Sequence, residues 1–199
     1  MKRLIKKASN QELYHATSVD SFFSIIESGE LRPQENQISD WAKKENIGYY
    51  FDGNEDLYNQ HMSNYIGYTF FATDQYSAQQ YGTRASDKSS FPNMYVIIKA
   101  ELPEELLMPD LNDVPDAKTW EDSDREAAQV CVLGSVSVNQ MVGLIIIMRD
   151  LHKEIETTFD NWKVDLKREL ALSVKRGYYD VDDCYELWDR LGIPNSSNG

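Results

Sequence analysis

Apolar and polar positions along the chain predict short strands that alternate with amphipathic helices. The first unit is a strand over 12–15, followed by a helix that ends at Gly29 and cannot continue past Pro33. Thr17 and Asp20 stand at capping-box spacing before this helix. Its apolar face comprises Phe22, Ile25 and Ile26. This unit places His15 at a strand end, beside backbone amides that are able to meet a ligand.

Further apolar runs predict four more strands. They cover 65–72, 94–102, 129–133 and 142–148. Asp74 is expected to cap a helix that ends before Gly82, and a turn containing Gly134 is expected to join the last two strands. The pattern is not the regular alternation of a doubly wound sheet, so it predicts an α+β fold with a split sheet.

Three segments depart from the strand pattern. Residues 35–65 are polar and predict an irregular loop with a short helix around Trp41, and the acidic stretch 104–126 predicts a surface excursion. Residues 150–191 show helical periodicity. We therefore expect a domain over 8–149, a helical C-terminal extension over 150–194 packed on it, and a disordered tail over 195–199.

Composition limits the classes of partner. The 199 residues carry a formal net charge of −13, which disfavours binding to nucleic acid backbones and to anionic membranes. The basic segment 1–7 is too short for a secretory signal, and the apolar run 141–148 is too short for a membrane span. Cys131 and Cys184 suggest neither a disulfide framework nor a zinc site. A cytoplasmic location is the simplest expectation.

Three separated segments carry the residues that bear on function. They are Tyr14-His15-Ala16-Thr17, then Phe70-Phe71-Ala72 with the following Tyr81, and Gln129-Val-Cys-Val-Leu-Gly-Ser-Val136. In this order they resemble the three motifs of the ADP-ribosyltransferase superfamily, in its poly(ADP-ribose) polymerase-like branch with a His-Tyr-Glu signature. Gly29-Glu-Leu-Arg-Pro33 resembles the stretch that follows the first motif. The resemblance covers roughly residues 12–148.

The resemblance implies an antiparallel split sheet, NAD as the substrate, no metal, and a role for each matching residue. His15 would hydrogen-bond a ribose hydroxyl of NAD. The backbone of Ala16, with help from the Thr17 hydroxyl, would hold the carboxamide. Tyr81 would stack on the nicotinamide ring, an aromatic contact worth on the order of 1 kcal/mol beyond burial.

The remaining binding residues of the resemblance are Arg32, Phe70 and Phe71. Arg32 would meet the adenosine side or a phosphate, which suits a guanidinium group, and the two phenylalanines would line the site. Taken alone, a histidine, a helix tyrosine and an arginine near a turn are more often structural or surface residues. The three motifs together favour the functional interpretation.

Gln129 departs from the pattern, because it stands where the family has a catalytic glutamate. An amide accepts the same ribose hydrogen bond without the full negative charge, and losing one such group commonly costs roughly 10²–10³ in rate. The resemblance therefore implies a mono-ADP-ribosyltransferase, with Glu126, Asp124 or Asp122 as candidates for a substitute carboxylate. The acidic net charge favours a protein target over nucleic acid. The alternative is a catalytically degenerate module that binds NAD or a protein partner.

A third possibility, an RNA 2′-phosphotransferase, needs several basic side chains to hold its polyanions. Only Arg32 and Arg84 lie near the motifs, so this reading ranks low. The small size and compact motifs suit a toxin or phage effector. His61 and His152 show no metal-ligand spacing and are expected to be exposed.

Overall fold

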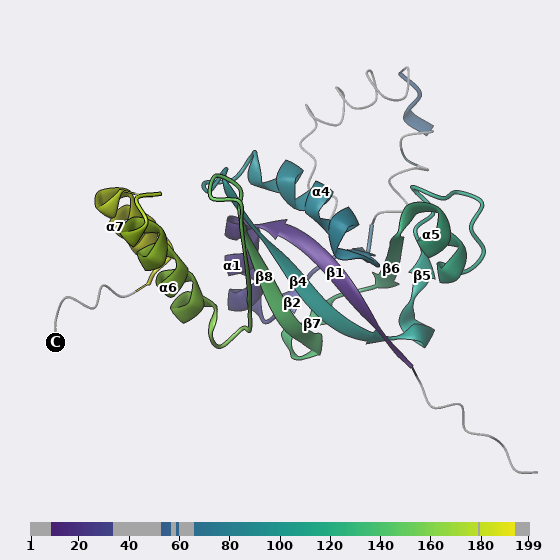
Figure 1. Ribbon diagram of the computed structural model, residues 1–199. Coiled ribbons are helices and arrows are strands. Elements are labelled where there is room, and N and C mark those ends of the chain that lie inside the picture. Colours follow the sequence, from purple (N-terminus) through teal and green to yellow (C-terminus); the bar gives the residue numbers. More distant parts are fainter. Residues whose placement is uncertain (1–8, 34–52, 57–58, 60–65, 179, 194–199) are drawn as a thin grey trace, which may run out of the picture.

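Seven strands form one antiparallel sheet in the computed structural model (Figure 1), which describes residues 9–33, 53–56, 59, 66–178 and 180–193. The strands are β1 (Asn10–Ser18), β3 (Tyr68–Ala72), β4 (Met94–Pro103), β5 (Met108–Pro109), β6 (Gln129–Leu133), β8 (Met141–Met148) and β9 (Lys153–Thr157). Their spatial order is β5-β6-β3-β1-β4-β8-β9, and β2 (Glu30–Leu31) pairs with β7 (Val136–Ser137) in a separate two-stranded sheet. The predicted α+β class and antiparallel sheet are confirmed.

Helices cover both faces of this sheet. They are α1 (Val19–Ser28), α4 (Gln75–Ser86), α5 (Trp120–Ala127), α6 (Trp162–Lys175) and α7 (Val181–Arg190), with short 3-10 helices at Glu104–Leu106 and Val138–Gln140. Figure 1 shows α6 and α7 at one end of the molecule and α5 beside β5 and β6 at the other. None of the helices in the described ranges combines the length and the apolar character that a membrane crossing requires.

Side-chain alternation along β4 separates two apolar cores. Val96 and Ile98 face a large cluster that includes Phe22 of α1 and Leu166 of α6. Their neighbours on the strand point to the opposite face, where a smaller cluster forms under α4. This second cluster contains Ala72, Ala78, Tyr95, Ile97, Ile145 and Ile147. Both faces of the central strands are therefore buried, which explains their continuous apolar sequence.

The first helix begins one residue later than its capping pattern predicts. The Ser18 side chain, rather than Thr17, accepts the hydrogen bond from the Ser21 backbone amide at 3.2 Å. Gly29 ends the helix with φ +75°, as expected, and donates to the carbonyl of Ile25 at 2.9 Å. Ile26 is exposed rather than part of the apolar face. Ser18 takes the cap because β1 continues through Ser18, so the first helical residue is Val19.

Two sequence predictions in the second half of the chain are wrong. β6 and β8 are not neighbours joined by a turn, because β3, β1 and β4 lie between them. Residues 153–157 form the edge strand β9 instead of a helix, since they pair in register with β8. The excursion 104–126 also contains β5 and α5. The predicted helix around Trp41 and the tail 195–199 lie outside the described residues.

Helix α4 continues through Gly82, where the sequence predicts its end. Gly82 is buried, and a β-carbon added there would lie 2.2 Å from Cδ2 of the Tyr95 ring on β4. Since real β-carbons do not approach other atoms so closely, the missing side chain is what lets the helix lie this near the sheet. Glycine at this position is therefore a packing requirement rather than a helix stop.

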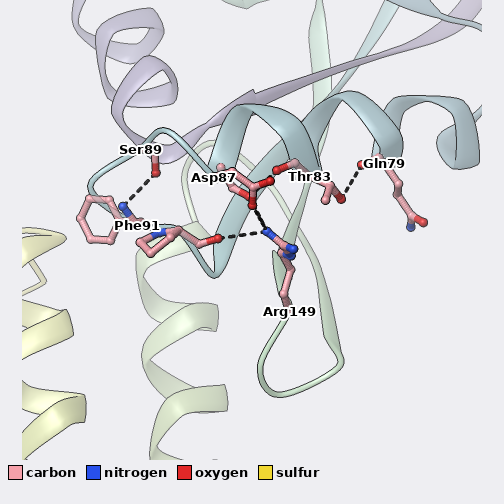
Figure 2. Close-up of polar contacts among 8 residues, drawn as sticks. Gln79, Thr83, Asp87, Ser89, Phe91 and Arg149 are labelled. Atoms are coloured by element: carbon pink, nitrogen blue, oxygen red, sulfur yellow. Dashed lines mark hydrogen bonds and ion pairs between the residues drawn. The ribbon is translucent and has the colours of Figure 1, made fainter.

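An arginine fixes the C-terminal end of α4 (Figure 2). Arg149, which follows β8, donates through Nη1 to the Asp87 carboxylate at 2.6 Å and to the Pro92 carbonyl at 3.2 Å. The same nitrogen lies 3.1 Å from Oγ of Ser86, the last residue of the helix. The Gly82 contact and this anchor together hold the C-terminal half of α4 against the sheet.

We expect Gly82→Ala to destabilise the fold by about 1–3 kcal/mol, the usual cost of overpacking a core. This cost exceeds the gain of about 1 kcal/mol that alanine brings over glycine in a helix, because the Tyr95 ring is itself buried. Urea-induced unfolding measures the difference in free energy.

Gly143→Ala is the matched control for this experiment. A β-carbon at Gly143 would meet its nearest atom, Cδ of Lys99, at an ordinary 3.6 Å, so we expect a change within about 0.5 kcal/mol. Equal effects of the two substitutions would contradict the close approach at Gly82.

Candidate active site

The three sequence motifs meet in one row across the sheet. Gln129 at the start of β6 pairs with Ala72 at the end of β3, and Ala72 pairs with Tyr14 of β1. Residues 14, 72 and 129 are thus neighbours in space although more than a hundred positions separate the first from the last. This row brings the candidate residues of the first, second and third motif to one place.

Strands β1 and β3 separate beside this row. They share one residue pair, Tyr14 with Ala72, whereas β1 pairs with β4 over its whole length. The His15 ring spans the gap: its Nδ1 lies 2.9 Å from the Phe70 carbonyl oxygen. A carbonyl only accepts, so Nδ1 carries the proton and Nε2 of the neutral ring is left as an acceptor.

Burial favours the neutral state of His15. Removal of the ring from water lowers its pKa below the ordinary value of 6.5, and the hydrogen bond to the Phe70 carbonyl opposes this shift without reversing it. The ring also packs edge-on against Phe71, with ring centres 5.9 Å apart. His15 therefore offers a lone pair rather than a positive charge at neutral pH.

Two cavities lie at this gap, and His15 and Phe70 line both. The smaller cavity, of about 130 Å³, lies on the α4 side. Its lining comprises Tyr14, His15, Ala16, Phe70, Phe71, Ala72, Ala78, Tyr81 and Gln129. The larger cavity, of about 540 Å³, lies on the α1 side and is bordered by Thr17, Arg32 and the hydroxyls of Ser21, Ser24 and Ser28, among others.

The structure therefore groups the predicted site residues into two sets. His15, Ala16, Phe70, Phe71, Tyr81 and Gln129 line the smaller cavity, and Thr17 and Arg32 line the larger one together with His15 and Phe70. The Arg32 guanidinium is exposed and already paired with the Glu30 carboxylate at 2.8 Å. A phosphate at Arg32 would have to share it with this internal partner.

Tyr81 and Gln129 are joined to an acidic residue that sequence reasoning missed. Nε2 of Gln129 donates to the Tyr81 hydroxyl and, at 2.6 Å, to the Asp113 carboxylate. The Tyr81 hydroxyl lies 3.5 Å from the same carboxylate oxygen. Burial raises the pKa of Tyr81, and the negative charge of Asp113 raises it further. The phenol therefore stays protonated at neutral pH.

The carboxylates proposed from the sequence are differently placed. Asp122 closes the capping box of α5 and pairs with Arg125 at 2.8 Å, which lowers the pKa of its carboxyl group. Within the described ranges, no hydrogen bond joins Asp122, Asp124 or Glu126 to Gln129. Proximity in sequence suggests these residues, whereas no local pattern identifies Asp113.

The described residues contain no cluster of three or more His, Cys, Asp or Glu side chains arranged to hold a metal ion. His152 is exposed, as predicted, and His61 lies outside the described residues. Cys131 and Cys184 are both buried and unpaired with each other.

Comparison with known proteins gives structural similarity only. No protein-family model and no curated protein matches the chain. Two structures of heat-labile enterotoxin mutants are similar to this chain, each with a TM-score of 0.44. The first is 23% identical and covers 73% of this chain and 73% of its own. The second is 22% identical and covers 73% of this chain and 61% of its own. The structure named EcPltA has a TM-score of 0.42 and 11% identity over 75% of this chain and 85% of its own. All three TM-scores are below 0.5, so these similarities assign no function to the chain.

The lowered pKa of His15 makes the fold sensitive to acid. A group with a depressed folded pKa contributes stability that is fully present above its unfolded pKa of about 6.5, and this contribution is lost progressively as pH falls from that value through the lower folded pKa. We expect His15→Gln to lose less stability than the wild type between neutral pH and about pH 5. Urea-induced unfolding at both pH values measures the free energy of unfolding of each variant.

His152→Asn controls for the loss of an exposed histidine, since asparagine tolerates the positive φ of 49° found at this position. Its pH dependence should match that of the wild type. An unchanged pH dependence in His15→Gln would show that the half-buried His15 ring is not the source of the acid sensitivity.

Proposed function

We propose that this chain is a mono-ADP-ribosyltransferase that transfers ADP-ribose from NAD to a protein. The observation that carries the proposal is that His15, Tyr81 and Gln129, drawn from three distant segments, line one small cavity. His15 and Tyr81 match the motifs of the superfamily, and Gln129 stands at the position of the family glutamate. Their convergence is what an NAD site requires, and separate structural roles would not demand it.

The two cavities suit the two ends of NAD. A cavity of about 150 Å³ holds a benzene ring in a protein core, so the smaller cavity, near 130 Å³, is on the scale of one aromatic ring, and we assign it to the ring of nicotinamide beside Tyr81. The larger cavity is lined by hydroxyl groups and by Arg32, which suit the ribose, phosphate and adenosine portions. His15, which lines both, would accept a hydrogen bond at Nε2 from a ribose hydroxyl.

The reaction separates nicotinamide from the ribose. The bond between ribose C1′ and the pyridinium nitrogen breaks with both electrons going to nitrogen, so nicotinamide leaves neutral and the ribose carries positive charge. The acceptor group on the target forms the new bond to C1′ and releases its proton. A neutral His15 and the oxygen of Gln129 would stabilise this cation better than a positively charged site would.

Charge supports a protein as the target. The net charge of −13 opposes approach to a nucleic acid backbone. We therefore propose a protein acceptor in the cytoplasm, and the modest size of the chain fits an effector from a toxin system or a phage.

Gln129 supports a second candidate function. Its amide lacks the charge of the family glutamate, and its nitrogen is already held by Tyr81 and Asp113. A domain that retains NAD binding without turnover, or that binds a protein partner, would show this substitution. Binding and transfer must therefore be measured separately.

Transfer is measured by incubating the full chain with NAD labelled on its adenylate portion and a cell lysate. We expect labelled protein, and a loss of label of roughly 10²-fold in His15→Ala. His152→Asn, the removal of an exposed histidine, should leave labelling unchanged. No label transfer from the wild type under any condition would reject the transferase proposal.

Binding is measured by calorimetry with NAD. Tyr81→Ala should weaken NAD binding about tenfold, because it removes an aromatic ring from the smaller cavity. Tyr76→Ala removes a tyrosine from the same helix that is 73% exposed and should leave the affinity unchanged. NAD binding by a wild type that shows no transfer would establish the second candidate function, and equal affinities of the two variants would exclude Tyr81 from the site.

A further inference from the structure

Asp113 is the acidic side chain that the structure places against the candidate site. Its carboxylate accepts from Gln129 Nε2 at 2.6 Å and lies 3.5 Å from the Tyr81 hydroxyl. Gln129 and Tyr81 line the smaller cavity, whereas Asp113 stands behind them and does not line it. Any influence of Asp113 on a ligand therefore passes through these two side chains or through its charge.

A rigid turn holds Asp113 in this place. The Val114 amide donates to the Asp110 carbonyl at 2.9 Å, and the Asn112 amide donates to the Asp110 carboxylate at 2.9 Å. The backbone amide of Asp110 donates at 3.0 Å to the hydroxyl of Ser123, a fully buried residue of α5. The turn is thus anchored to the helix on one side.

Strand β5 anchors the turn on the other side. Pro109 pairs with Val130 of β6, and the Cys131 thiol donates to the Pro109 carbonyl at 3.3 Å. Asp110 follows Pro109 directly, and Gln129 precedes Val130, so the antiparallel register brings the turn level with Gln129. Although the Asp113 carboxylate is itself exposed, its backbone is positioned by buried contacts.

The carboxylate determines how the Gln129 amide is oriented. An ionised carboxylate only accepts hydrogen bonds, so Gln129 must turn its NH₂ group toward Asp113. Among the described residues, Oε1 of Gln129 has no hydrogen-bond partner. The amide oxygen is therefore the atom left to interact with a ligand in the smaller cavity, as the proposed ribose contact requires.

We propose that Asp113 is a positioning residue for Gln129 and the source of the negative charge that Gln129 itself lacks. The pair divides between two residues what a glutamate does alone: Gln129 supplies the acceptor oxygen, and Asp113 supplies the charge and holds the amide. This inference rests on the proposed NAD chemistry. In this proposal Asp113, rather than Asp122, Asp124 or Glu126, is the carboxylate that substitutes for the family glutamate.

Two substitutions separate the roles of orientation and charge. Asp113→Asn keeps an oxygen for Gln129 Nε2 but removes the charge, and Asp113→Ala removes both. Release of nicotinamide from NAD gives kcat and KM. We expect Asp113→Asn to lower kcat about tenfold with KM within about twofold, less than for a direct contact because the carboxylate is exposed. Asp113→Ala should lower kcat similarly and also raise KM about fivefold.

Asp116→Asn is the matched control, because Asp116 is an exposed carboxylate nearby in the same acidic segment. It should behave as the wild type. Asp113→Glu should recover most of the activity lost in Asp113→Ala. Wild-type kinetics in both Asp113→Asn and Asp113→Ala would overturn the proposal.

A charge exchange gives a readout that a purely structural role would not move. Gln129→Glu places two carboxylates at hydrogen-bond distance, so they share a proton and the pH profile of kcat shifts toward higher pH. Adding Asp113→Asn to Gln129→Glu leaves one carboxylate and one amide in reversed positions, and it should return the profile to that of the wild type. Identical profiles for the single and the double variant would overturn the proposal.

The failures of the two proposals are distinguishable. If the wild type binds NAD without releasing nicotinamide, the transferase proposal fails, and Asp113 is then tested by affinity: Asp113→Ala should weaken NAD binding about fivefold and Asp113→Asn should not. Equal affinities would overturn the role of Asp113. A wild type that neither binds NAD nor releases nicotinamide overturns both proposals.

Discussion

The hydrogen bond between the His15 ring and the Phe70 carbonyl bridges the point where β1 and β3 come apart. Backbone pairing joins these strands at one residue pair, so a side chain takes over the connection where the ladder ends. This opening creates both cavities, and the same bond fixes which nitrogen of His15 is left for a ligand. The candidate site therefore depends on an interrupted ladder in an otherwise continuous sheet.

Around this opening, the acidic protein presents neutral groups to a ligand. His15 is held neutral by burial, Tyr81 remains protonated, and Gln129 is an amide. Asp113 places a negative charge behind these side chains without lining the smaller cavity. The described residues that line the smaller cavity include no carboxylate, whereas those of the larger cavity include Glu30, which is paired with Arg32. In the proposed reaction, positive charge would therefore develop against a neutral wall with a negative potential close by.

Local sequence patterns predicted the parts of the fold that local interactions determine. Gly29 ends α1 and Asp74 caps α4 because both effects need only neighbouring residues. The predictions for the end of α4 and for strand β9 are wrong because both depend on contacts between segments distant in sequence or on strand pairing. Gly82 is required by close packing against Tyr95, and β9 forms because it pairs with β8. Six residues named from the motif resemblance line the smaller cavity, whereas Thr17 and Arg32 line the larger one. Asp113 was not predicted, because its contact with Gln129 arises from the β5–β6 pairing and leaves no signature in the residues around it.

Tyr95, a residue of the smaller core cluster, sets the spacing between α4 and the sheet. The ring does not line the smaller cavity, yet it lies under Gly82 and acts as a spacer between α4 and the sheet. Tyr81 is the adjacent residue on that helix, so the height of the spacer sets how far the Tyr81 ring stands from β1. The width of the smaller cavity therefore depends on Tyr95, a residue that does not line it. The size of ring that the site admits is a property of the second core as much as of the residues that would touch the ligand.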